Sequence, residues 1–491
     1  MASLDELREE RLKKLSLLAE RGIPAYPVSS ARDTTVEEAV GSFDTLQKKE
    51  AILALAGRVR TIRAQGALIF FDLDDGSGVI QCLLKKDAVA HDLFSLFGEG
   101  VDGGDFVEVR GSLFLTKRGE KTLAVGDWRM LAKALRPLPD KFHGLADAEE
   151  RQRRRYLDIL ANPEARERFL LRSRTVSFLR AELDRAGFLE VETPALQPLY
   201  GGASAEPFTT HHNALDQDLY LRISDELYLK RLLVAGFPKV YELCKDFRNE
   251  GVDATHYPEF TMLEWYESYS DALKQRKFVE ELFRMLVRDI KKESGVSYGG
   301  ETVDFLKPFR VVKYFALLEE HTGAPNLKEV TLPELREHAE KLGAEFAPED
   351  GRGKILDILY KKFCRGKLIQ PTFIIDYPAD AFPLTKKKED DPSLVDMFQL
   401  VIGGLEIVKA FSELNDPREQ RERFLAQDVL AGRGDKEAQP VDEDFLEAME
   451  HGMPPAGGVG IGIDRLVMLL TGTQNIKDTI LFPTMRPAAG R

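Results

Sequence analysis

The sequence has few cysteines, no long apolar run and no excess of basic residues. Its three cysteines, Cys82, Cys244 and Cys364, lie far apart in 491 residues, which argues against a disulfide framework or a cysteine knuckle for a metal ion. The longest apolar runs, such as 51–56 and 466–470, are far too short to cross a bilayer, so we expect no membrane contact. The first residues are charged and lack the apolar core of a secretory signal, so we expect a cytoplasmic protein.

The excess of charge is acidic. Lys and Arg number 69 and Asp and Glu number 82, for a net charge of -13, which excludes a protein whose whole surface is basic and coats nucleic acid. Residues 55–140 differ from this average, because they contain 12 basic and 12 acidic residues. A local nucleic-acid site in that segment therefore remains possible.

Changes in residue pattern predict a multidomain α+β protein. A capping box at Ser3 and leucines at helical spacing predict a helical segment in 1–50. Residues 51–140 contain five short β-rich runs with one helical interruption, which predicts a small five-stranded β-barrel of the OB type. Proline and charge predict a linker in 141–165. Strands and helices in mixed order then form a last domain, 166–491, without the regular alternation of a doubly wound parallel sheet.

The segment 239–271, KVYELCKDFRNEGVDATHYPEFTMLEWYESYSD, predicts a strand, a loop and a second strand. Arg248 and Glu250 share one face of the first strand, and alternate residues of the second strand are Phe260, Met262, Glu264 and Tyr266. Such a face is as typical of the outer side of an exposed hairpin as of a binding site. The large aromatic side chains favour a site, because aromatic rings usually bury.

Two further segments carry polar groups in apolar surroundings. In VIGGLEIVKAFSELNDP, 401–417, Glu406 and Glu413 lie among apolar residues, where an acid needs a partner or a cation. In GGVGIGIDRLVMLL, from Gly457, glycines lead into a helix with Arg465 near its start. This second segment lacks the spacing of a phosphate-binding P-loop, and on its own it is equally consistent with close packing.

The order of these motifs resembles that of a known family. GFLEVETP, FRNEG with the following histidine and EF, and GIGIDR follow one another as do motifs 1, 2 and 3 of class II aminoacyl-tRNA synthetases. The phrases AGRVRTIRAQG, ELYLKRLLVAGF and GGLEIVKAFSELNDP are similar to lysyl-tRNA synthetases, and the similarity runs from about residue 56 to the C-terminus. The resemblance implies an OB-type anticodon-binding domain, a class II catalytic domain with an antiparallel sheet, and a homodimer formed through motif 1, which ends at Pro194.

The resemblance also implies a reaction and its ATP-binding residues. L-Lysine is activated by ATP to lysyl-adenylate with Mg²⁺ as cofactor, and the lysyl group is then transferred to tRNA(Lys). Arg248 matches the arginine that binds the α-phosphate, and Glu250 matches the acid that reads the adenine amine. Phe260 matches the ring that stacks on adenine, and His256 and Arg465 match the residues that hold the far phosphates. Arg248 and Arg465 are accordingly the expected catalytic residues.

The same comparison implies a lysine pocket. Gly202 and Glu226 match residues that receive the α-ammonium, and Glu264, Tyr266 and Glu413 match those around the side-chain ammonium. An ammonium removed from water needs carboxylate and hydroxyl acceptors, whereas a related enzyme for aspartate would need a cation at this place. The acids of the pocket therefore favour lysine over aspartate.

Two positions depart from the family pattern. Glu406 matches one metal-binding glutamate, but the residue seven places earlier, often a second one, is Gln399. An amide oxygen can bind magnesium only without charge, so we expect a weaker metal site there. Lys409 stands where relatives often carry asparagine. Its ammonium could repel the substrate ammonium, or it could bind a carboxylate or phosphate, and the sequence leaves both interpretations open.

In the barrel, the resemblance places anticodon-binding residues at Arg63, Phe70, Gln81 and Glu120. A ring that stacks on a base, with polar groups beside it, suits bases splayed out of a single strand. Because Phe70 and its neighbour Phe71 point in opposite directions, one of the two should be exposed.

Two other functions stay open at this point. The first is an amino-acid ligase of the same catalytic fold that forms an amide without tRNA, against which the predicted barrel counts. The second is a non-catalytic tRNA-binding or regulatory paralogue, which Gln399 and Lys409 suggest. The presence of Arg248, Glu250, Phe260 and Arg465 counts against this second function.

Overall fold

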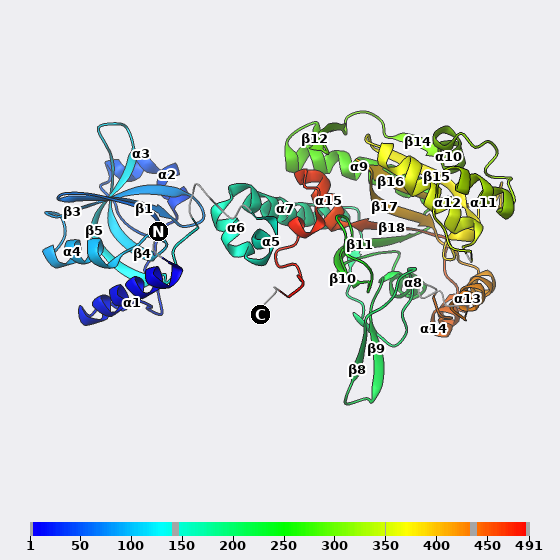
Figure 1. Ribbon diagram of the computed structural model, residues 1–491, viewed down its shortest axis with the longest axis horizontal. Coiled ribbons are helices and arrows are strands. Elements are labelled where there is room, and N and C mark those ends of the chain that lie inside the picture. Colours follow the sequence, from blue (N-terminus) through cyan, green and yellow to red (C-terminus); the bar gives the residue numbers. More distant parts are fainter. Residues whose placement is uncertain (1–2, 140–146, 349, 433–438, 488–491) are drawn as a thin grey trace. The chain divides into compact units, whose positions relative to one another are not determined.

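The computed structural model describes residues 3–139, 147–348, 350–432 and 439–487. The chain forms two compact units, Met1–Ala146 and Asp147–Arg491, shown in Figure 1. Among the described residues, no helix has the length and the apolar character needed to span a membrane.

The first unit is a closed barrel with the strand order β1-β2-β3-β5-β4. Its strands are β1 (Ile52–Gln65), β2 (Leu68–Asp74), β3 (Val79–Lys85), β4 (Phe106–Leu115) and β5 (Lys121–Ala132). Its helices are α1 (Leu4–Glu20), α2 (Val36–Gly41), α3 (Phe43–Lys48) and α4 (His91–Gly100). Side chains of β2 alternate, so that Ile69, Phe71 and Leu73 fill the barrel. The predicted five-stranded barrel with one helical interruption is confirmed.

The second unit is built on an eight-stranded sheet with the order β14-β15-β16-β17-β18-β11-β10-β6. Neighbouring strands are antiparallel except for the pairs β14–β15 and β10–β6. The strands are β6 (Leu189–Glu190), β10 (Lys239–Phe247), β11 (Glu259–Ser268), β14 (Arg310–Lys313), β15 (Thr372–Pro378), β16 (Leu394–Ile402), β17 (Leu405–Ser412) and β18 (Ala456–Gly462). The antiparallel catalytic sheet implied by the resemblance is confirmed.

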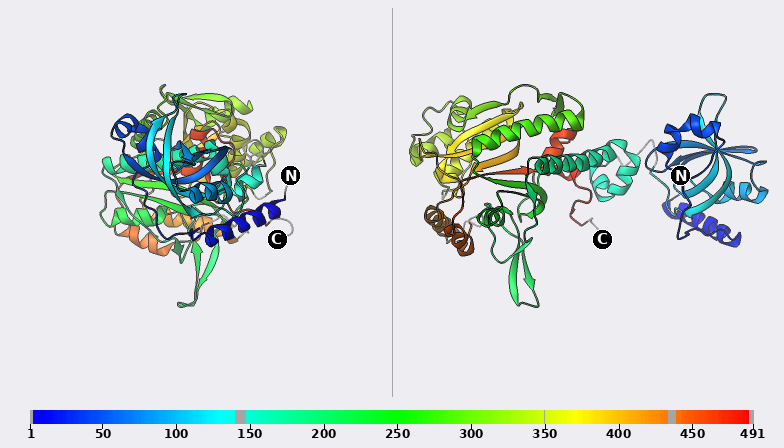
Figure 2. Two further views of the ribbon diagram at one scale, coloured as in Figure 1. Left: turned by 90° about the vertical axis from the view of Figure 1, so that its left-hand side faces the viewer. Right: turned by 180° about the vertical axis from the view of Figure 1, so that it is seen from behind.

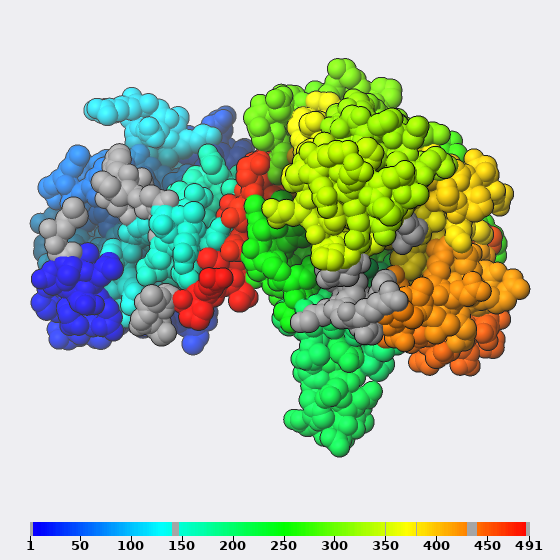
Figure 3. Space-filling view, turned by 45° about the vertical axis from the view of Figure 1, so that its right-hand side comes forward, coloured from blue at the N-terminus to red at the C-terminus, as the bar shows by residue number. Residues whose placement is uncertain are grey.

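Two small sheets complete the strands of this unit. They comprise β7 (Leu196–Gln197), β8 (Thr209–His212) and β9 (Gln217–Leu221), and separately β12 (Gly295–Tyr298) and β13 (Glu301–Asp304). The β8–β9 hairpin projects from the surface of the unit, as Figure 3 shows.

The helices of the second unit flank the sheet. They are α5 (Ala148–Arg153), α6 (Arg155–Ala161), α7 (Pro163–Arg185), α8 (Glu226–Val234), α9 (Ala272–Leu286), α10 (Tyr314–Thr322), α11 (Leu332–Lys341), α12 (Arg352–Leu359), α13 (Pro417–Gly432), α14 (Glu443–Glu450) and α15 (Ile463–Thr471). Shorter helical turns are η1 (Val287–Lys291), η2 (Tyr360–Cys364), η3 (Arg365–Lys367), η4 (Ala379–Ala381) and η5 (Ile476–Thr479).

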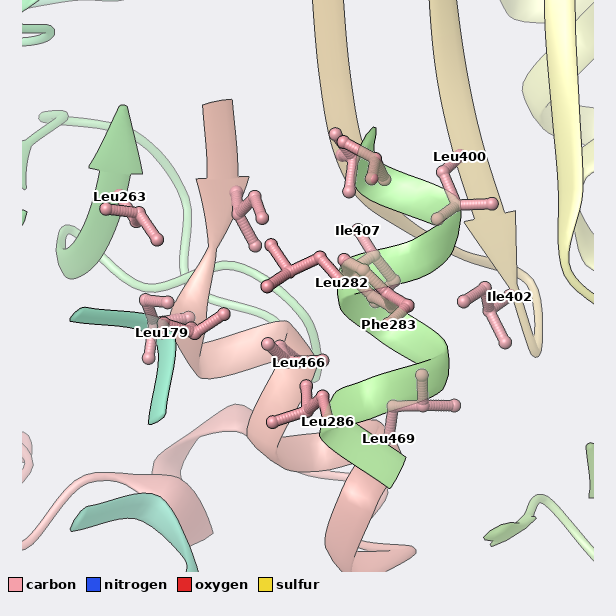
Figure 4. Close-up of a cluster of buried hydrophobic side chains, with 14 of the residues drawn as sticks. Leu179, Leu263, Leu282, Phe283, Leu286, Leu400, Ile402, Ile407, Leu466 and Leu469 are labelled. Atoms are coloured by element: carbon pink, nitrogen blue, oxygen red, sulfur yellow. The ribbon is translucent and has the colours of Figure 1, made fainter. Parts of the chain in front are cut away.

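The main hydrophobic core lies between one face of the sheet and helices α7, α9 and α15. Helix α9 lies across that face, as the view from behind in Figure 2 shows. Figure 4 shows Leu282 and Leu286 of α9 against Ile407 of β17 and Leu466 of α15. Because strand side chains alternate, one face of the central strands is committed to this core and the other is left for a second layer or a site.

Helices cover that other face in two places, and the larger layer lies over β14–β16. Tyr314 of α10, Tyr360 of η2 and Tyr377 of β15 form a separate buried cluster with residues of α11 and α12. Helix α8 packs on β10 and β11, where Leu227, Val240 and Tyr266 belong to one buried cluster. The other side chains of β11, β17 and β18 on this face surround a cavity.

The predicted linker, 141–165, differs from the structure. Residues 141–146 lie outside the described residues, and from Asp147 onward the segment forms α5 and α6 within the second unit. The guanidinium of Arg155 is buried, and its Nη1 donates a hydrogen bond of 2.7 Å to Oδ2 of Asp158. A buried ion pair of this kind needs fixed surroundings, so the charge run packs against the unit instead of extending through solvent.

Candidate active site

A cavity of about 290 Å³ lies over β11, β17 and β18 in the second unit. Alternate residues of β11, namely Phe260, Met262, Glu264 and Tyr266, line it. The residues between them, Leu263 and Trp265, are fully buried in the main core. The segment predicted from sequence therefore forms the wall of a cavity and not the outer face of an exposed hairpin.

Glycines of β18 form the floor of this cavity. Gly458, Gly460 and Gly462 lie opposite Tyr266, Glu264 and Met262 in the strand register. A Cβ atom at Gly458 would lie 2.1 Å from Oε1 of Glu413 and 2.4 Å from Cε1 of Tyr266. Since such distances are far below van der Waals contact, only glycine lets these two side chains meet here.

Acids gather at one end of the cavity. Glu226, the first residue of α8, and Glu264 both line it, and the hydroxyl of Tyr266 donates a hydrogen bond of 2.9 Å to Oε2 of Glu264. Burial raises the pKa of Glu264 to about 8, and the neighbouring carboxylates of Glu226 and Asp246 add to this effect. Near neutral pH, a cationic ligand that binds at this end of the cavity would favour loss of the proton from Glu264.

Glu413 follows β17, and its carboxylate lies on the cavity side of Gly458, in the space that a side chain there would occupy, without lining the cavity itself. Nζ of Lys230 lies 2.5 Å from Oε2 of Glu413 and 2.5 Å from Oε1 of Glu226. Lys230 was not among the residues predicted for the site. Its position four residues after Glu226 on one helix was the signal in the sequence, since acids and lysines at that spacing pair.

More buried acids lie beside this cluster. Ligand atoms of Asp225, Glu242 and Cys244 lie within 4.8 Å of one another, and so do those of Asp225, Asp246 and Glu264. Burial, with Glu264 nearby, raises the pKa of Asp225 well above its usual value, and burial likewise raises the pKa of the Cys244 thiol. Groups that hold protons so firmly are poor metal ligands, because a metal ion binds the deprotonated forms.

The opposite end of the cavity carries basic groups. Strand β10 ends at Phe247, so Arg248 and Glu250 lie in the loop beyond it and not on the strand as predicted. Both line the cavity, and Cζ of Arg248 lies 5.0 Å from the centre of the Phe260 ring. A flat aromatic face beside a guanidinium suits a planar base followed by a phosphate.

His256 and Arg465 meet at this same end. Nη2 of Arg465 lies 2.9 Å from Nε2 of His256, whose Nδ1 lies 2.8 Å from Oδ2 of Asp253. These partners fit the tautomer in which Nδ1 donates to Asp253 and Nε2 accepts from Arg465. Burial raises the pKa of Asp253, but hydrogen bonds from Thr255 and His256 outweigh this and hold it at about 2.

Arg465 is fixed by its neighbour Asp464 at the start of α15. Oδ2 of Asp464 accepts a hydrogen bond of 2.6 Å from the backbone N–H of Thr261, and Oδ1 accepts one of 2.7 Å from Nη1 of Arg172 on α7. Helix α15 is thereby attached to β11 and α7 at the point where Arg465 enters the cavity. Burial lowers the pKa of Arg465, with the carboxylate of Glu406 acting in the opposite direction.

The two residues predicted for magnesium differ in their surroundings. The carboxylate of Glu406 lines the cavity near Arg465 and fits a magnesium ion that also takes phosphate oxygens and waters as ligands. Gln399 does not line the cavity. It lies on the β16 face covered by the tyrosine cluster, where its Oε1 accepts a hydrogen bond of 2.7 Å from the hydroxyl of Tyr377. These surroundings suit Glu406 as an acidic ligand of magnesium and do not suit Gln399 as a second ligand.

The predicted cavity residues therefore come together with two exceptions. Those that line the cavity are Gly202, Glu226, Arg248, Glu250, His256, Phe260, Glu264, Tyr266, Glu406 and Arg465, and Lys409 joins them. Glu413 lies against Gly458 on the same face of the sheet as the cavity, and Gln399 lies outside the cavity.

The residues predicted for the anticodon lie in the first unit. Arg63 of β1 pairs in register with Phe70 of β2, so both project from the same face of the sheet. Phe71 is fully buried in the barrel core and Phe70 is half-buried on the outside, so the two rings point in opposite directions as predicted, but neither is fully exposed. Gln81 lies on β3, and Glu120 is exposed just before β5.

Comparisons with known proteins agree with this architecture. Residues 147–486 match the family described as tRNA synthetases class II (D, K and N), and residues 53–131 match the OB-fold nucleic acid binding domain. A lysine–tRNA ligase of Roseiflexus castenholzii is 47% identical over 99% of both chains. One of Carboxydothermus hydrogenoformans is 45% identical over 99% of both chains.

The chain belongs to the lysine–tRNA ligase family of class II tRNA synthetases. Another relative, the lysine–tRNA ligase of Methanoculleus marisnigri, is 46% identical over 97% of this chain and 94% of its own. The chain thus combines a class II synthetase domain, in the second unit, with an OB-fold domain, in the first.

Proposed function

We propose that this chain activates L-lysine with ATP to form lysyl-adenylate and then transfers the lysyl group to tRNA(Lys). The observation that carries the proposal is the polarity of the cavity, which has carboxylates at one end and guanidinium groups beside an aromatic ring at the other. Membership of the lysine–tRNA ligase family supports the same reaction.

The basic end is proposed to bind ATP. Adenine stacks on Phe260 and its amine donates to Glu250, while Arg248 holds the α-phosphate, and His256 and Arg465 hold the phosphates beyond it. No protein nucleophile is needed, because the substrate carboxylate attacks the α-phosphate directly and pyrophosphate leaves. The protein aligns the two groups and offsets negative charge with fixed cations, which stabilises the transition state.

Glu406 is the residue proposed to hold magnesium. With ATP bound, an ion held there would neutralise phosphate charge and help to orient the leaving pyrophosphate. Glu406 would supply an acidic protein ligand to it.

The acidic end is proposed to receive the lysine substrate. Glu226 and the backbone at Gly202 meet the α-ammonium, and Glu264, Tyr266 and Glu413 surround the side-chain ammonium. Among the residues that the structure describes, no donor forms a hydrogen bond with the buried Oε1 of Glu413 over Gly458. This supports the role, because such a carboxylate oxygen needs a cation or a donor from a ligand. An uncharged analogue of lysine would leave these groups unpaired and be rejected.

The barrel is proposed to bind the anticodon of tRNA(Lys) through Arg63, Phe70, Gln81 and Glu120. The half-exposed ring of Phe70 beside the guanidinium of Arg63 supports a stacking role for an unpaired base. Since the charged tRNA is used in translation, we propose that the protein acts in the cytoplasm.

A homodimer formed through motif 1 is part of the proposal. Leu170 of α7, Leu189 of β6 and Leu196 of β7 are between 43% and 47% exposed, and β6 is an edge strand of the large sheet. Exposed apolar residues and a free strand edge are typical of a surface that a second copy covers. Sedimentation of the wild type and of Leu189→Glu tests it, since only the wild type should sediment as a dimer.

One assay tests the activity. Amino-acid-dependent exchange of pyrophosphate into ATP is measured with each of the twenty amino acids, followed by charging of tRNA. We expect exchange with lysine and charging of tRNA(Lys). Exchange without charging would indicate an amide-forming ligase, and no exchange with any amino acid would indicate a non-catalytic protein.

A further inference from the structure

The side chain of Lys230 is a buried cation that lies between two acids from distant parts of the chain. Its Nζ donates a hydrogen bond of 2.5 Å to Oε1 of Glu226 and lies 2.5 Å from Oε2 of Glu413. Lys230 is fully buried and does not line the cavity, whereas Glu226 does. Burial lowers the pKa of Lys230, but the two carboxylates outweigh this and raise it, so the ammonium stays charged.

Both ends of this bridge rest on rigid elements. Lys230 and Glu226 lie one turn apart on α8, which packs on β10 and β11. The backbone N–H of Glu413 donates a hydrogen bond of 2.8 Å to the carbonyl of Ala456 at the start of β18. Nζ of Lys230 also lies 5.9 Å from the centre of the Tyr266 ring. Because the ammonium cannot turn without losing one of its partners, it holds the two carboxylates at a fixed separation.

The bridge leaves part of Glu413 open to a ligand. Its Oε2 faces Lys230, and within the described part of the chain no donor forms a hydrogen bond with its Oε1. Burial raises the pKa of Glu413 to about 8, with Lys230 acting against this and Glu226 and Glu264 adding to it. A substrate ammonium beside Oε1 would favour the ionised form, as Lys230 does. One oxygen can therefore bind a ligand while the other is held in place.

The separation of these acids matters for a substrate with two ammonium groups. In the proposed function, Glu226 receives the α-ammonium and Glu413 the side-chain ammonium. Since both contacts of Lys230 measure 2.5 Å, the two bridged oxygens lie within twice that distance of each other. Acids fixed in this way fit one length of side chain. Ornithine has one methylene less than lysine, so it cannot place both of its ammonium groups where lysine places them.

We propose that Lys230 determines the length of side chain that the site accepts, because it holds Glu226 and Glu413 at the separation that suits lysine and not ornithine. This assignment rests on the proposed function and deepens it. Lys230 acts through the two acids and transfers no proton. It is therefore a positioning residue that sets specificity and not a catalytic residue.

The test compares lysine with ornithine. The kcat/KM for amino-acid-dependent exchange of pyrophosphate into ATP is measured with each of them for the wild type, Lys230→Met and Lys230→Arg. We expect the wild type to prefer lysine, and Lys230→Met to lower the ratio of the two values at least about 10-fold, because a released Glu413 can follow the shorter side chain. Lys230→Arg should keep more of the preference, because a guanidinium can bind both carboxylates.

The matched control is Arg231→Met. Arg231 is the next residue of α8, and its Nη2 donates hydrogen bonds of 3.0 and 2.8 Å to the two carboxylate oxygens of Asp442, away from the cavity lining. Its loss should leave the ratio unchanged even where stability falls, and thermal unfolding measures that fall. A lower ratio in Arg231→Met as well would overturn the role of Lys230, because any loosening of α8 would then explain it.

The other outcomes are equally decisive. An equal loss with both amino acids in Lys230→Met, an unchanged ratio, or a wild type without preference would overturn the role of Lys230. If Lys230→Met fails to fold, Lys230→Gln, which keeps hydrogen-bond donors without the charge, is judged by the same criteria. A wild type that activates neither amino acid would overturn the proposed function instead.

Discussion

The ammonium of Lys230 lies 2.5 Å from Oε2 of Glu413, and neither side chain is exposed to solvent. The same ammonium lies 2.5 Å from Oε1 of Glu226. One internal cation therefore joins two acids that are proposed to receive opposite ends of the substrate. Glu264 lies beside them, and the hydroxyl of Tyr266 donates a hydrogen bond to its Oε2.

The Glu413→Gln variant tests the acidic end. The change replaces one carboxylate oxygen with an amide NH₂ group, which donates hydrogen bonds instead of accepting them, and leaves Glu226 as a partner for Lys230. We expect the KM for lysine to rise about 10- to 100-fold in the exchange assay while the KM for ATP changes by less than about threefold. Thermal unfolding of the variant controls for a loss of packing. Equal rises in both constants would remove Glu413 from the lysine pocket.

The Gly458→Ala variant tests the glycine floor. Its new methyl group would lie 2.1 Å from Glu413 and 2.4 Å from Tyr266, so both side chains must move. We expect a large rise in the KM for lysine together with a loss of stability of about 1–3 kcal/mol from overpacking. The matched control is Gly462→Ala, which meets no heavy atom within 4 Å and should leave thermal unfolding nearly unchanged.

The raised pKa of Glu264 predicts that lysine binding releases protons. With a pKa of about 8, this carboxyl is mostly protonated at pH 7, and a bound ammonium favours its ionised form. Affinity for lysine should therefore rise between pH 6 and about 8. Calorimetry at pH 7 in two buffers with different ionisation enthalpies measures the released protons, and identical heats in both would contradict the prediction.

The same shift has a consequence for the unliganded protein. Because the folded-state pKa of Glu264 lies above the ordinary value of 4.5, this carboxyl stabilises the fold fully below pH 4.5. The contribution is lost as the pH rises toward about 8. We expect the midpoint of thermal unfolding to fall over this range in the wild type, and to fall less in Glu264→Gln. A wild type and a variant with equal pH dependence would show that another group is responsible.

The barrel prediction uses adjacent phenylalanines. Phe70→Ala should impair charging of tRNA(Lys) and leave lysine-dependent exchange intact, because the ring lies outside the barrel core. Phe71→Ala removes a fully buried ring that packs against Phe97, with a distance of 4.8 Å between ring centres, and should destabilise the barrel by about 3–5 kcal/mol. If Phe70→Ala charges tRNA as well as the wild type, Phe70 does not contact the anticodon.

Local pattern was enough to predict the barrel, whereas most residues that line the cavity were predicted from the family resemblance. The alternation of Phe260, Glu264 and Tyr266 along one strand specifies a common face, and the structure places that face in the cavity. The position of Glu413 over Gly458 could not be predicted from local pattern. It depends on the register between β17 and β18, which is set by long-range pairing.

Burial of single side chains was equally beyond the sequence. Gln399 alternates with Met397 and Val401, which is a pattern that fits either a site or a core. Only the layer formed by α10–α12 decides that its amide faces Tyr377. The short helices at 148–161 are a similar case, since a run of arginines looks solvated until a partner such as Asp158 is known to lie inside the unit.

Asp464 and Arg465 are adjacent in the chain but have different roles. One side chain attaches α15 to Arg172 and Thr261, and the next reaches the phosphate end of the cavity. The accuracy with which the arginine is aimed thus depends on a helix, α7, that contributes no atom to the cavity lining. Substitution of Arg172 on the inward face of α7 is therefore constrained by the chemistry of the site, although this helix does not line the cavity.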